Sequence, residues 1–365
     1  MKLHELTNYL ESLAPLAYQE DYDNSGLIVG HPDKEINQAL VSLDCTEAVV
    51  DDAIAKDCQV IISHHPIVFK GLKKLNGKTY VERVIEKAIK NNIAIYAIHT
   101  NLDAVAHGVN ARICETLGIT DCRILAPKHG ILKKLVTYVP VNYADKVRAA
   151  LFAAGAGQIG NYSECSFNTE GIGTFKAGEN TDPFIGQKGI TQNEPEVKIE
   201  TVYPASLESK ILVALFMEHP YEEVAYDLYP LTNQYPTVGS GMIGELAEPM
   251  SELDFLQMVK YKMNAGAIRY TKLRNKSVKR VAVCGGSGSF LLKNAIGAGA
   301  DVFVTADFKY HEFFDAEEKL VIADIGHFES EQFTQNLIVE IIKKKFVNFA
   351  VRLTEVNTNP IKYLI

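Results

Sequence analysis

The chain has 365 residues, of which 47% are apolar and 22% charged, a balance typical of a folded globular protein rather than a disordered or fibrous chain. Its 37 basic and 45 acidic residues give a formal net charge of -8, which argues against a sequence-independent grip on nucleic acid. The longest apolar run, Ile211–Met217, is far shorter than the ~20 residues of a membrane-spanning helix, and Met1–Leu6 lacks the parts of an export signal. We therefore expect a cytoplasmic protein of two or three domains that makes no membrane contact.

Short apolar runs alternate with helical patterns in the first third of the chain, which is typical of a parallel α/β layer. We predict strands at 39–43, 59–62 and 93–98, with helices at 46–56 and 80–91. Each predicted strand ends in polar residues. Because ligands bind beyond the carboxyl ends of strands in open parallel sheets, these endings are candidate site residues.

The last third of the chain repeats this alternation. We predict strands at 278–283, 301–305 and 320–323, a helix at 290–298 and one long amphipathic helix at 329–345. Here too the strands run into polar residues, with Asp307 after the second strand and His327 after the third.

The middle of the chain has a different pattern. It predicts strand 135–139, helix 143–154, strands within 165–175 and 197–203, helix 206–216 and strand 223–229, with an irregular stretch over 171–195. This βαββαβ order is that of a ferredoxin-like α+β domain. We therefore expect an α/β body built from residues 1–130 and 236–365, interrupted by an inserted domain of residues 131–235.

Five residues form the strongest candidate site. His64 and His65 follow a predicted strand, Asp103 closes the next strand and loop, and His327 and Glu331 lie four residues apart where a strand gives way to a helix. The i, i+4 spacing places the last two on one helical face. Imidazoles and carboxylates suit zinc, iron or manganese, and five ligands exceed the need of one tetrahedral ion, so two divalent ions sharing a bridging carboxylate would use them better. Taken singly, however, a His-His pair can be a helix cap beside a core residue, and His-x-x-x-Glu also occurs on solvated helices.

Other polar or glycine-rich segments have two interpretations. Gly285–Ser289 follows a predicted strand, where its N–H groups could hold a phosphate, although we favour a tight turn that requires glycine. Asp44 and Asp23–Asn24 could belong to the site or could cap the elements that follow them, and we favour capping.

Five segments resemble the signature segments of the Nif-three-like family, whose members are often named GTP cyclohydrolase I type 2 homologues or dinuclear metal-centre proteins. They are Asp23–Leu27, Ser63–Pro66, His99–Asp103, Thr305–Glu312 and Gly326–Glu331. The resemblance implies a three-layer α/β metal-binding body in which the metal ligands are His64, His65, Asp103, His327 and Glu331. We assign His65 with Asp103 to one ion, His64 with His327 to the other, and Glu331 as the bridge.

Three further residues lie in the same segments. His99 and His311 could be a general acid or base, could orient a metal ligand, or could be hydrogen-bonded structural residues. Asp307 could orient a ligand or contact a substrate.

The predicted insert has a resemblance of its own. Segments 159–162, 165–167, 171–175 and 219–223 are similar to those of long-form members of the family, whose middle domain resembles PII and CutA proteins. Together the two resemblances imply a toroidal homohexamer whose metal sites face an internal cavity.

We expect a dinuclear-metal-dependent hydrolase that acts on a nucleotide or related phosphorylated compound. The family resemblance implies GTP as the substrate, with hydroxide attacking C8 of the purine to open the ring. The alternative is a non-catalytic metal-binding or regulatory hexamer that senses a small molecule through the PII-like insert.

Overall fold

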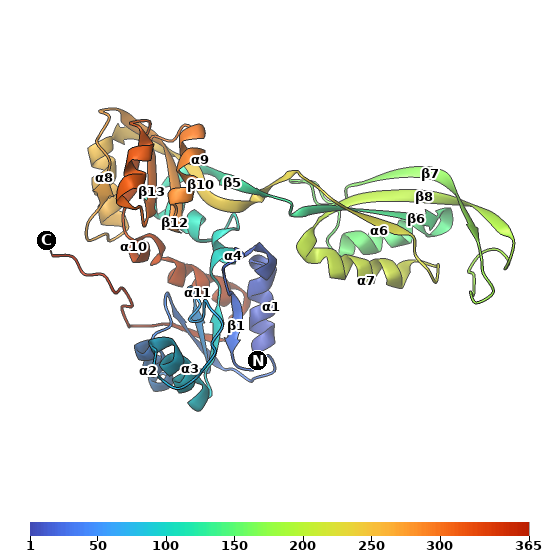
Figure 1. Ribbon diagram of the computed structural model, residues 1–365, viewed down its shortest axis with the longest axis horizontal. Coiled ribbons are helices and arrows are strands. Elements are labelled where there is room, and N and C mark those ends of the chain that lie inside the picture. Colours follow the sequence, from blue (N-terminus) through green and yellow to red (C-terminus); the bar gives the residue numbers. More distant parts are fainter. Residues whose placement is uncertain (365) are drawn as a thin grey trace. The chain divides into compact units, whose positions relative to one another are not determined.

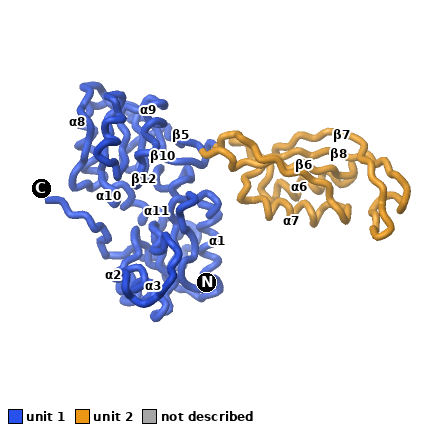
Figure 2. The backbone as a smooth tube through the Cα atoms, in the orientation of Figure 1, with its two compact units in different colours: residues 1–127, 236–365 blue, residues 128–235 orange. Residues whose placement is uncertain are grey.

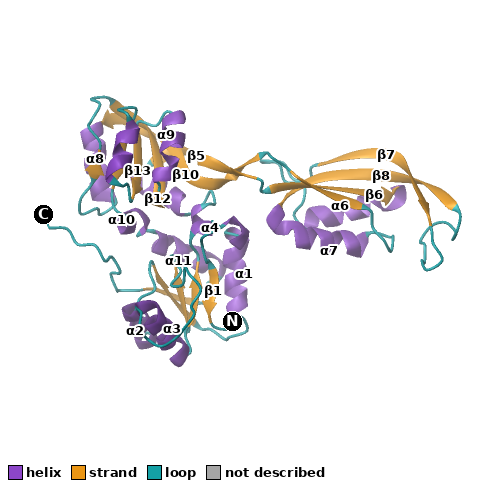
Figure 3. Cartoon of the chain, in the orientation of Figure 1, coloured by secondary structure: helices purple, strands orange, loops and turns teal. Residues whose placement is uncertain are grey.

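The chain divides into two compact units in the computed structural model, which describes residues 1–364. Unit 1 joins Met1–Pro127 to the described residues from Pro236 onward, and unit 2 is Lys128–Tyr235 (Figure 2). The sequence predicted an insert of 131–235. Both units mix helices with strands, so the fold is α/β overall (Figure 3). No helix within residues 1–364 combines the length and apolar character needed to cross a membrane.

The first sheet of unit 1 has five strands in the order β1-β4-β3-β2-β15. β1 is antiparallel to β4, and the other neighbours are parallel. The strands are β1 (Gly26–Val29), β2 (Gln38–Ser42), β3 (Val60–Ser63), β4 (Ala94–Ala97) and β15 (Ala350–Leu353). Successive side chains of a strand point to opposite faces. One face packs on α2 (Glu47–Ala55) and α3 (Tyr80–Lys90), and the other packs on α1 (Leu3–Leu13) and α11 (Thr334–Lys345).

The second sheet of unit 1 has six strands in the order β11-β14-β13-β12-β10-β5. The three central strands are parallel to one another. The strands are β5 (Ile119–His129), β10 (Gln234–Ser251), β11 (Arg269–Tyr270), β12 (Ser277–Ser287), β13 (Val302–Ala306) and β14 (Val321–Asp324). Helices α5 (Val109–Leu117) and α8 (Glu252–Lys262) pack on one face, and α9 (Leu292–Gly297) packs on the other.

Local sequence explains where these elements begin and end. Thr46 and Thr79 each accept a hydrogen bond from a first-turn N–H group of the helix that follows, α2 and α3 respectively. Gly118 ends α5 in the left-handed conformation, with φ of 78°, which glycine adopts without strain. Every residue of β3 and of β13 is buried, as expected for central parallel strands covered on both faces.

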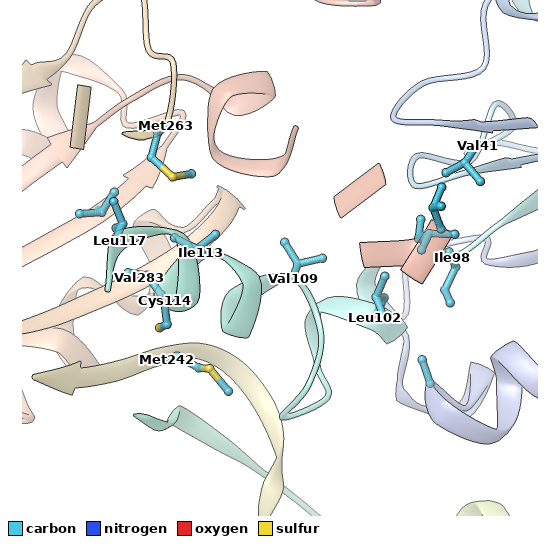
Figure 4. Packing of buried hydrophobic residues seen from close by; sticks show 14 of the residues in the cluster. Val41, Ile98, Leu102, Val109, Ile113, Cys114, Leu117, Met242, Met263 and Val283 are labelled. Carbon is cyan, nitrogen blue, oxygen red and sulfur yellow. The ribbon is translucent and has the colours of Figure 1, made fainter. Parts of the chain in front are cut away.

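One hydrophobic core joins the two sheets of unit 1. Val41 comes from β2 of the first sheet, and Ile98 directly follows β4 of the same sheet. Met242 and Val283 come from the second sheet (Figure 4). Between them lie the apolar side chains of α5 and of the short helix α4 (Thr100–Asp103). Because this core is continuous, the strand ends of both sheets belong to one packed body.

Unit 2 contains a four-stranded antiparallel sheet in the order β7-β8-β6-β9, with two helices packed through a core of their own (Figure 1). Its elements are β6 (Leu132–Pro140), α6 (Ala144–Ala153), β7 (Ser166–Lys176), β8 (Thr191–Pro204), α7 (Glu208–Glu218) and β9 (Tyr226–Pro230).

Two predicted elements differ from the structure. The single helix predicted at 329–345 is two helices, α10 (His327–Glu331) and α11. The irregular stretch predicted at 171–195 is confined to 177–190, since β7 and β8 pair without interruption from Ser166↔Thr201 to Lys176↔Thr191. Glycine is favoured at position 173 of β7 because the Glu196 carboxylate occupies the space that a Cβ would fill.

Candidate metal centre

The candidate residues gather where strands of both sheets end. Asp44, His64 and His65 follow the neighbouring strands β2 and β3, which are in register up to Ser42↔Ser63. Asp103 closes α4, which follows β4, and His327 opens α10, which follows β14. The structure therefore brings together residues more than 200 positions apart in the sequence, at the carboxyl ends of parallel strands.

One group of possible metal ligands comprises His64, Asp103 and Glu331, whose ligand atoms lie within 4.8 Å of one another. His64 Nε2 is 3.7 Å from Asp103 Oδ1 and 3.8 Å from Glu331 Oε1. His64 Nδ1 donates to the Ile98 carbonyl oxygen at 2.8 Å, so the other ring nitrogen presents its lone pair to the group. His64 Nε2 and Asp103 Oδ1 are both buried without a hydrogen-bond partner among residues 1–364.

A second group comprises His65, His327 and Glu331. His65 Nε2 lies 3.0 Å from Glu331 Oε2, and His327 Nε2 lies 3.2 Å from both Glu331 Oε2 and His65 Nε2. The outer ring nitrogens are held by carboxylates, since His65 Nδ1 donates to Asp44 at 2.8 Å and His327 Nδ1 to Asp307 at 2.6 Å. Both rings therefore aim Nε2 at the same point, which is the arrangement of metal-binding histidines held by carboxylates.

The two groups share Glu331 but differ from the pairing that we expected. His65 lies with His327, and His64 lies with Asp103, whereas the sequence-based prediction paired His65 with Asp103 and His64 with His327. The reason is the direction in which the two adjacent rings turn. The Ile98 carbonyl fixes His64 toward α4, whereas Asp44 fixes His65 toward α10.

The electrostatics of the second group also fit a cation. Burial alone would lower the pKa of His65, but Asp44 and Glu331 raise it to about 9. Burial also opposes protonation of His327, yet Glu331 and Asp307 raise its pKa to about 11. Burial would raise the pKa of Glu331, whereas His327 and the other two imidazoles hold it well below its usual range. The group thus attracts positive charge, which a divalent ion would supply in place of protons.

In the first group the main electrostatic effect is the burial of a carboxylate. Burial raises the pKa of Asp103, because a carboxylate is poorly solvated there. An unpartnered imidazole nitrogen beside such a carboxylate is costly in a protein interior unless a further atom satisfies both. The donor atoms present, imidazole nitrogen and carboxylate oxygen, are those that zinc, iron and manganese bind. Both groups therefore fit divalent metal ions.

The two histidines predicted as catalytic have different positions. His99 lies beside the first group, forming a possible ligand set with His64 and His65, and its Nδ1 donates to Asp23 at 2.8 Å. His311 lies on an exposed 3-10 helix, Tyr310–Ala316, with its ring against Tyr310 and Phe314. His311 is not among the described residues around the metal groups, so no geometry supports a catalytic role for it.

Comparison with known proteins assigns the family. The sequence profile of the Duf34/NIF3 (NGG1p interacting factor 3) family matches residues 1–360. The chain belongs to this family. A Bacillus subtilis relative named "GTP cyclohydrolase 1 type 2 homolog" is 41% identical over 99% of this chain and 98% of its own length. A relative of the same name from Halalkalibacterium halodurans is 40% identical over 97% of this chain and 96% of its own.

Solved structures share the fold over the whole chain. A Bacillus cereus protein described as related to NIF3 is 40% identical, with a TM-score of 0.86 over 100% of this chain and 99% of its own. A Staphylococcus aureus structure is 31% identical, with a TM-score of 0.79 over the same shares of the two chains.

A cavity of about 950 Å³ opens beside the candidate metal groups of this Duf34/NIF3 protein. Exposed aromatic rings contribute to its wall, among them Tyr22, Phe69, Tyr80 and Phe290. Arg269 is the one arginine or lysine in the described lining, and its guanidinium already pairs with Asp324. The cavity is thus large enough for a nucleotide-sized compound and offers ring-stacking surfaces.

The glycine-rich loop at the end of β12 is a tight turn. Gly286 has a φ of 60°, and its N–H donates to Ser330 Oγ at 2.9 Å. The N–H of Gly285 donates to Asn110 Oδ1 at 3.0 Å. These two donors are used within the protein, which leaves the phosphate interpretation without support here.

Sequence reasoning missed the role of two carboxylates. Asp44 does not cap α2, because Thr46 does so, and it instead holds His65. Asp23 holds His99 and accepts hydrogen bonds from the N–H and hydroxyl groups of Thr100. Each lies in a polar segment after or before a strand, where capping and ligand support have the same local sequence signal.

Proposed function

We propose that this chain is a dinuclear-metal-dependent hydrolase that acts on a nucleotide or related phosphorylated compound. The observation that carries the proposal is the buried carboxylate of Glu331, which is shared by two imidazole-containing groups. One of these groups has unpartnered buried ligand atoms, and the other has two imidazoles aimed at one point. Two-metal hydrolytic sites with a shared carboxylate have ions ~3.5–4 Å apart.

Each of the two ions would have its own set of ligands, with Glu331 in both sets. His64, Asp103 and Glu331 would hold one divalent ion, and His65, His327 and Glu331 the other; zinc, iron or manganese would fit. Such ions supply Lewis acidity and lower the pKa of water toward neutrality. Asp307 would orient His327.

His99 is the best-placed residue to hold or move a proton. Its Nδ1 is fixed by Asp23, whose pKa lies well below its usual range because the bond and charge of His99 outweigh the effect of burial. Its Nε2 would therefore face the substrate cavity, which His99 helps to line. His99→Gln is expected to lower turnover more than it lowers metal content.

The name shared by the curated relatives suggests the substrate. For this chain we propose GTP or a compound like it, with water attacking C8 of the purine to open the ring. Aromatic rings around the cavity suit a stacked base, which supports a nucleotide over a simple phosphoester.

The test is turnover by purified protein loaded in turn with zinc, iron or manganese, offered GTP, other nucleotides and a phosphoester panel. Activity that is lost in Glu331→Gln supports the proposal. Glu340→Gln is the control, because Glu340 is an exposed glutamate on α11 that pairs only with Arg112 among the ion pairs of residues 1–364. Fully metal-loaded protein that turns over none of these compounds would refute it.

A second candidate function rests on a cavity in unit 2. This cavity, of about 610 Å³, is lined by Tyr138, Phe175, Phe184 and Tyr221 together with the buried carboxylate of Glu196. It favours the alternative of a regulatory protein that senses a small molecule through a PII- or CutA-like, ferredoxin-like insert. Ligands that bind only unit 2 of a metal-loaded but inactive protein would support this alternative.

The assembly and location belong to the same proposal. We propose a toroidal homohexamer in the cytoplasm, with a small molecule as its substrate or effector and no membrane contact. Nucleic acid is a poor fit to the net charge of -8. Sedimentation analysis checks the hexamer, and a stable monomer in solution would contradict it.

A further inference from the structure

The chain beyond β15 runs past the candidate metal centre. Thr354 Oγ1 donates to Asp52 Oδ2 at 2.7 Å as the chain leaves the sheet. Four residues later, Thr358 Oγ1 donates to Asp44 Oδ2 at 2.6 Å. Asn359 Nδ2 then donates to Glu329 Oε1 at 3.0 Å, on the helix that bears His327 and Glu331. The C-terminal segment, defined here as residues 354–364, thus contacts both sides of the centre, and the end of the ribbon is labelled C in Figure 1.

Asp44 connects this segment to a candidate ligand. Its Oδ1 accepts from His65 Nδ1 at 2.8 Å, while its Oδ2 accepts from Thr358. Both carboxylate oxygens are therefore engaged, and the rotation of the carboxylate is fixed by Thr358. A carboxylate that holds Nδ1–H of a histidine fixes the tautomer and the ring direction and makes Nε2 a better ligand.

We propose that Thr358 and Asp44 are positioning residues that set the affinity of the ion held by His65 and His327, so that the C-terminal segment controls one of the two metal positions. This inference rests on the proposed function, in which His65 is a metal ligand. The other position is held differently, because His64 Nδ1 is fixed by the backbone carbonyl of Ile98 and not by the C-terminal segment. Loss of Thr358 should therefore affect the two ions unequally.

The coupling must also act in the reverse direction. If the C-terminal segment strengthens binding of an ion, then the bound ion stabilises the contacts of the segment by the same factor. Metal loading should accordingly slow hydrogen exchange and proteolysis in residues 354–364. This slowing should be smaller in Thr358→Val than in the wild type, because the variant lacks the hydrogen bond that links the segment to Asp44.

The experiment titrates metal-free full-length protein with zinc against a chelator of known affinity, and resolves the two binding steps. Thr358→Val should weaken one step about 2- to 10-fold, as expected for one lost hydrogen bond, and leave the other unchanged. Asp44→Asn should weaken the same step by about 10- to 100-fold. Thr358→Ser, which keeps the hydroxyl, should restore wild-type affinity.

Thr354→Val is the matched control. Thr354 has the same side chain, similar exposure and the same kind of bond to an aspartate, but that aspartate, Asp52, contacts no candidate ligand in the described residues. If Thr358→Val binds both ions as tightly as Thr354→Val and the wild type do, this inference is overturned and the metal centre is left intact. Wild-type protein that binds fewer than half an ion per chain would overturn the proposed centre and this inference with it.

Discussion

Gly286→Ala is expected to remove both metal ions although Gly286 is not a ligand. The residue has a φ of 60°, where a non-glycine residue costs ~1–2 kcal/mol. An added Cβ would also lie 3.3 Å from Glu331 Cδ and 3.3 Å from His327 Cε1, and closer still to Glu331 Oε1. Because the glutamate is part of both ligand groups, displacing its carboxylate should weaken both positions at once.

Two measurements separate the backbone effect from the displacement. Urea unfolding of metal-free protein should show a loss of at least ~1–2 kcal/mol, and elemental analysis of metal-loaded protein should show the loss of both ions. Gly299→Ala is the control, since Gly299 has a φ of 72° but its nearest contact for a Cβ is Arg280 Nη1 at 3.4 Å. It should lose comparable stability and keep its metal. A Gly286→Ala protein with the metal content of Gly299→Ala would refute the reasoning.

Three further predictions follow from the same contacts. Asp103→Asn should weaken binding of the ion beside His64, and His327→Ala should weaken binding of the ion beside His65. A metal titration that resolves the two binding steps measures this, and loss of the same ion in both variants would contradict the grouping. Chelation should lower the melting temperature of the loaded protein, because an ion present at 100 times its Kd contributes about 2.7 kcal/mol, and an unchanged melting temperature would argue against tight binding. In unit 2, burial lowers the pKa of His219, whose Nδ1 accepts from the Tyr221 N–H. The neutral side chain therefore contributes its full stabilisation above the unfolded pKa of about 6.5, and this stabilisation is lost as pH falls through the lower folded pKa. The free energy of unfolding in urea should depend less on pH between 7 and 5 in His219→Gln than in the wild type. Equal dependence in the two proteins would contradict this assignment.

Local sequence predicted the elements that place the candidate site. The strands before His64 and before His327 contain the apolar runs Val60–Ile62 and Val321–Ala323, and such runs identify central strands whose ends define a site edge. The four-residue spacing of His327 and Glu331 correctly predicted one helical face, since α10 spans those two residues. These features depend only on neighbours along the chain, which is why they could be predicted.

Features that depend on distant contacts could not be predicted. The directions of the His64 and His65 rings are decided by Ile98 and Asp44, and no periodicity reports which partner each ring will meet. Thr358 lies 314 positions from Asp44, so its role is visible only in three dimensions. The helix predicted at 329–345 is interrupted by a turn at residues 332–333, between α10 and α11. The apolar pattern runs across both helices and therefore does not reveal this break.

The arrangement of two ions around Glu331 is tested most directly by anomalous X-ray diffraction from crystals loaded with zinc, iron or manganese. Two peaks ~3.5–4 Å apart are predicted, one beside His64 and Asp103 and the other beside His65 and His327, with the Glu331 carboxylate in contact with both. A single peak away from Glu331, or no peak in fully loaded crystals, would contradict the account.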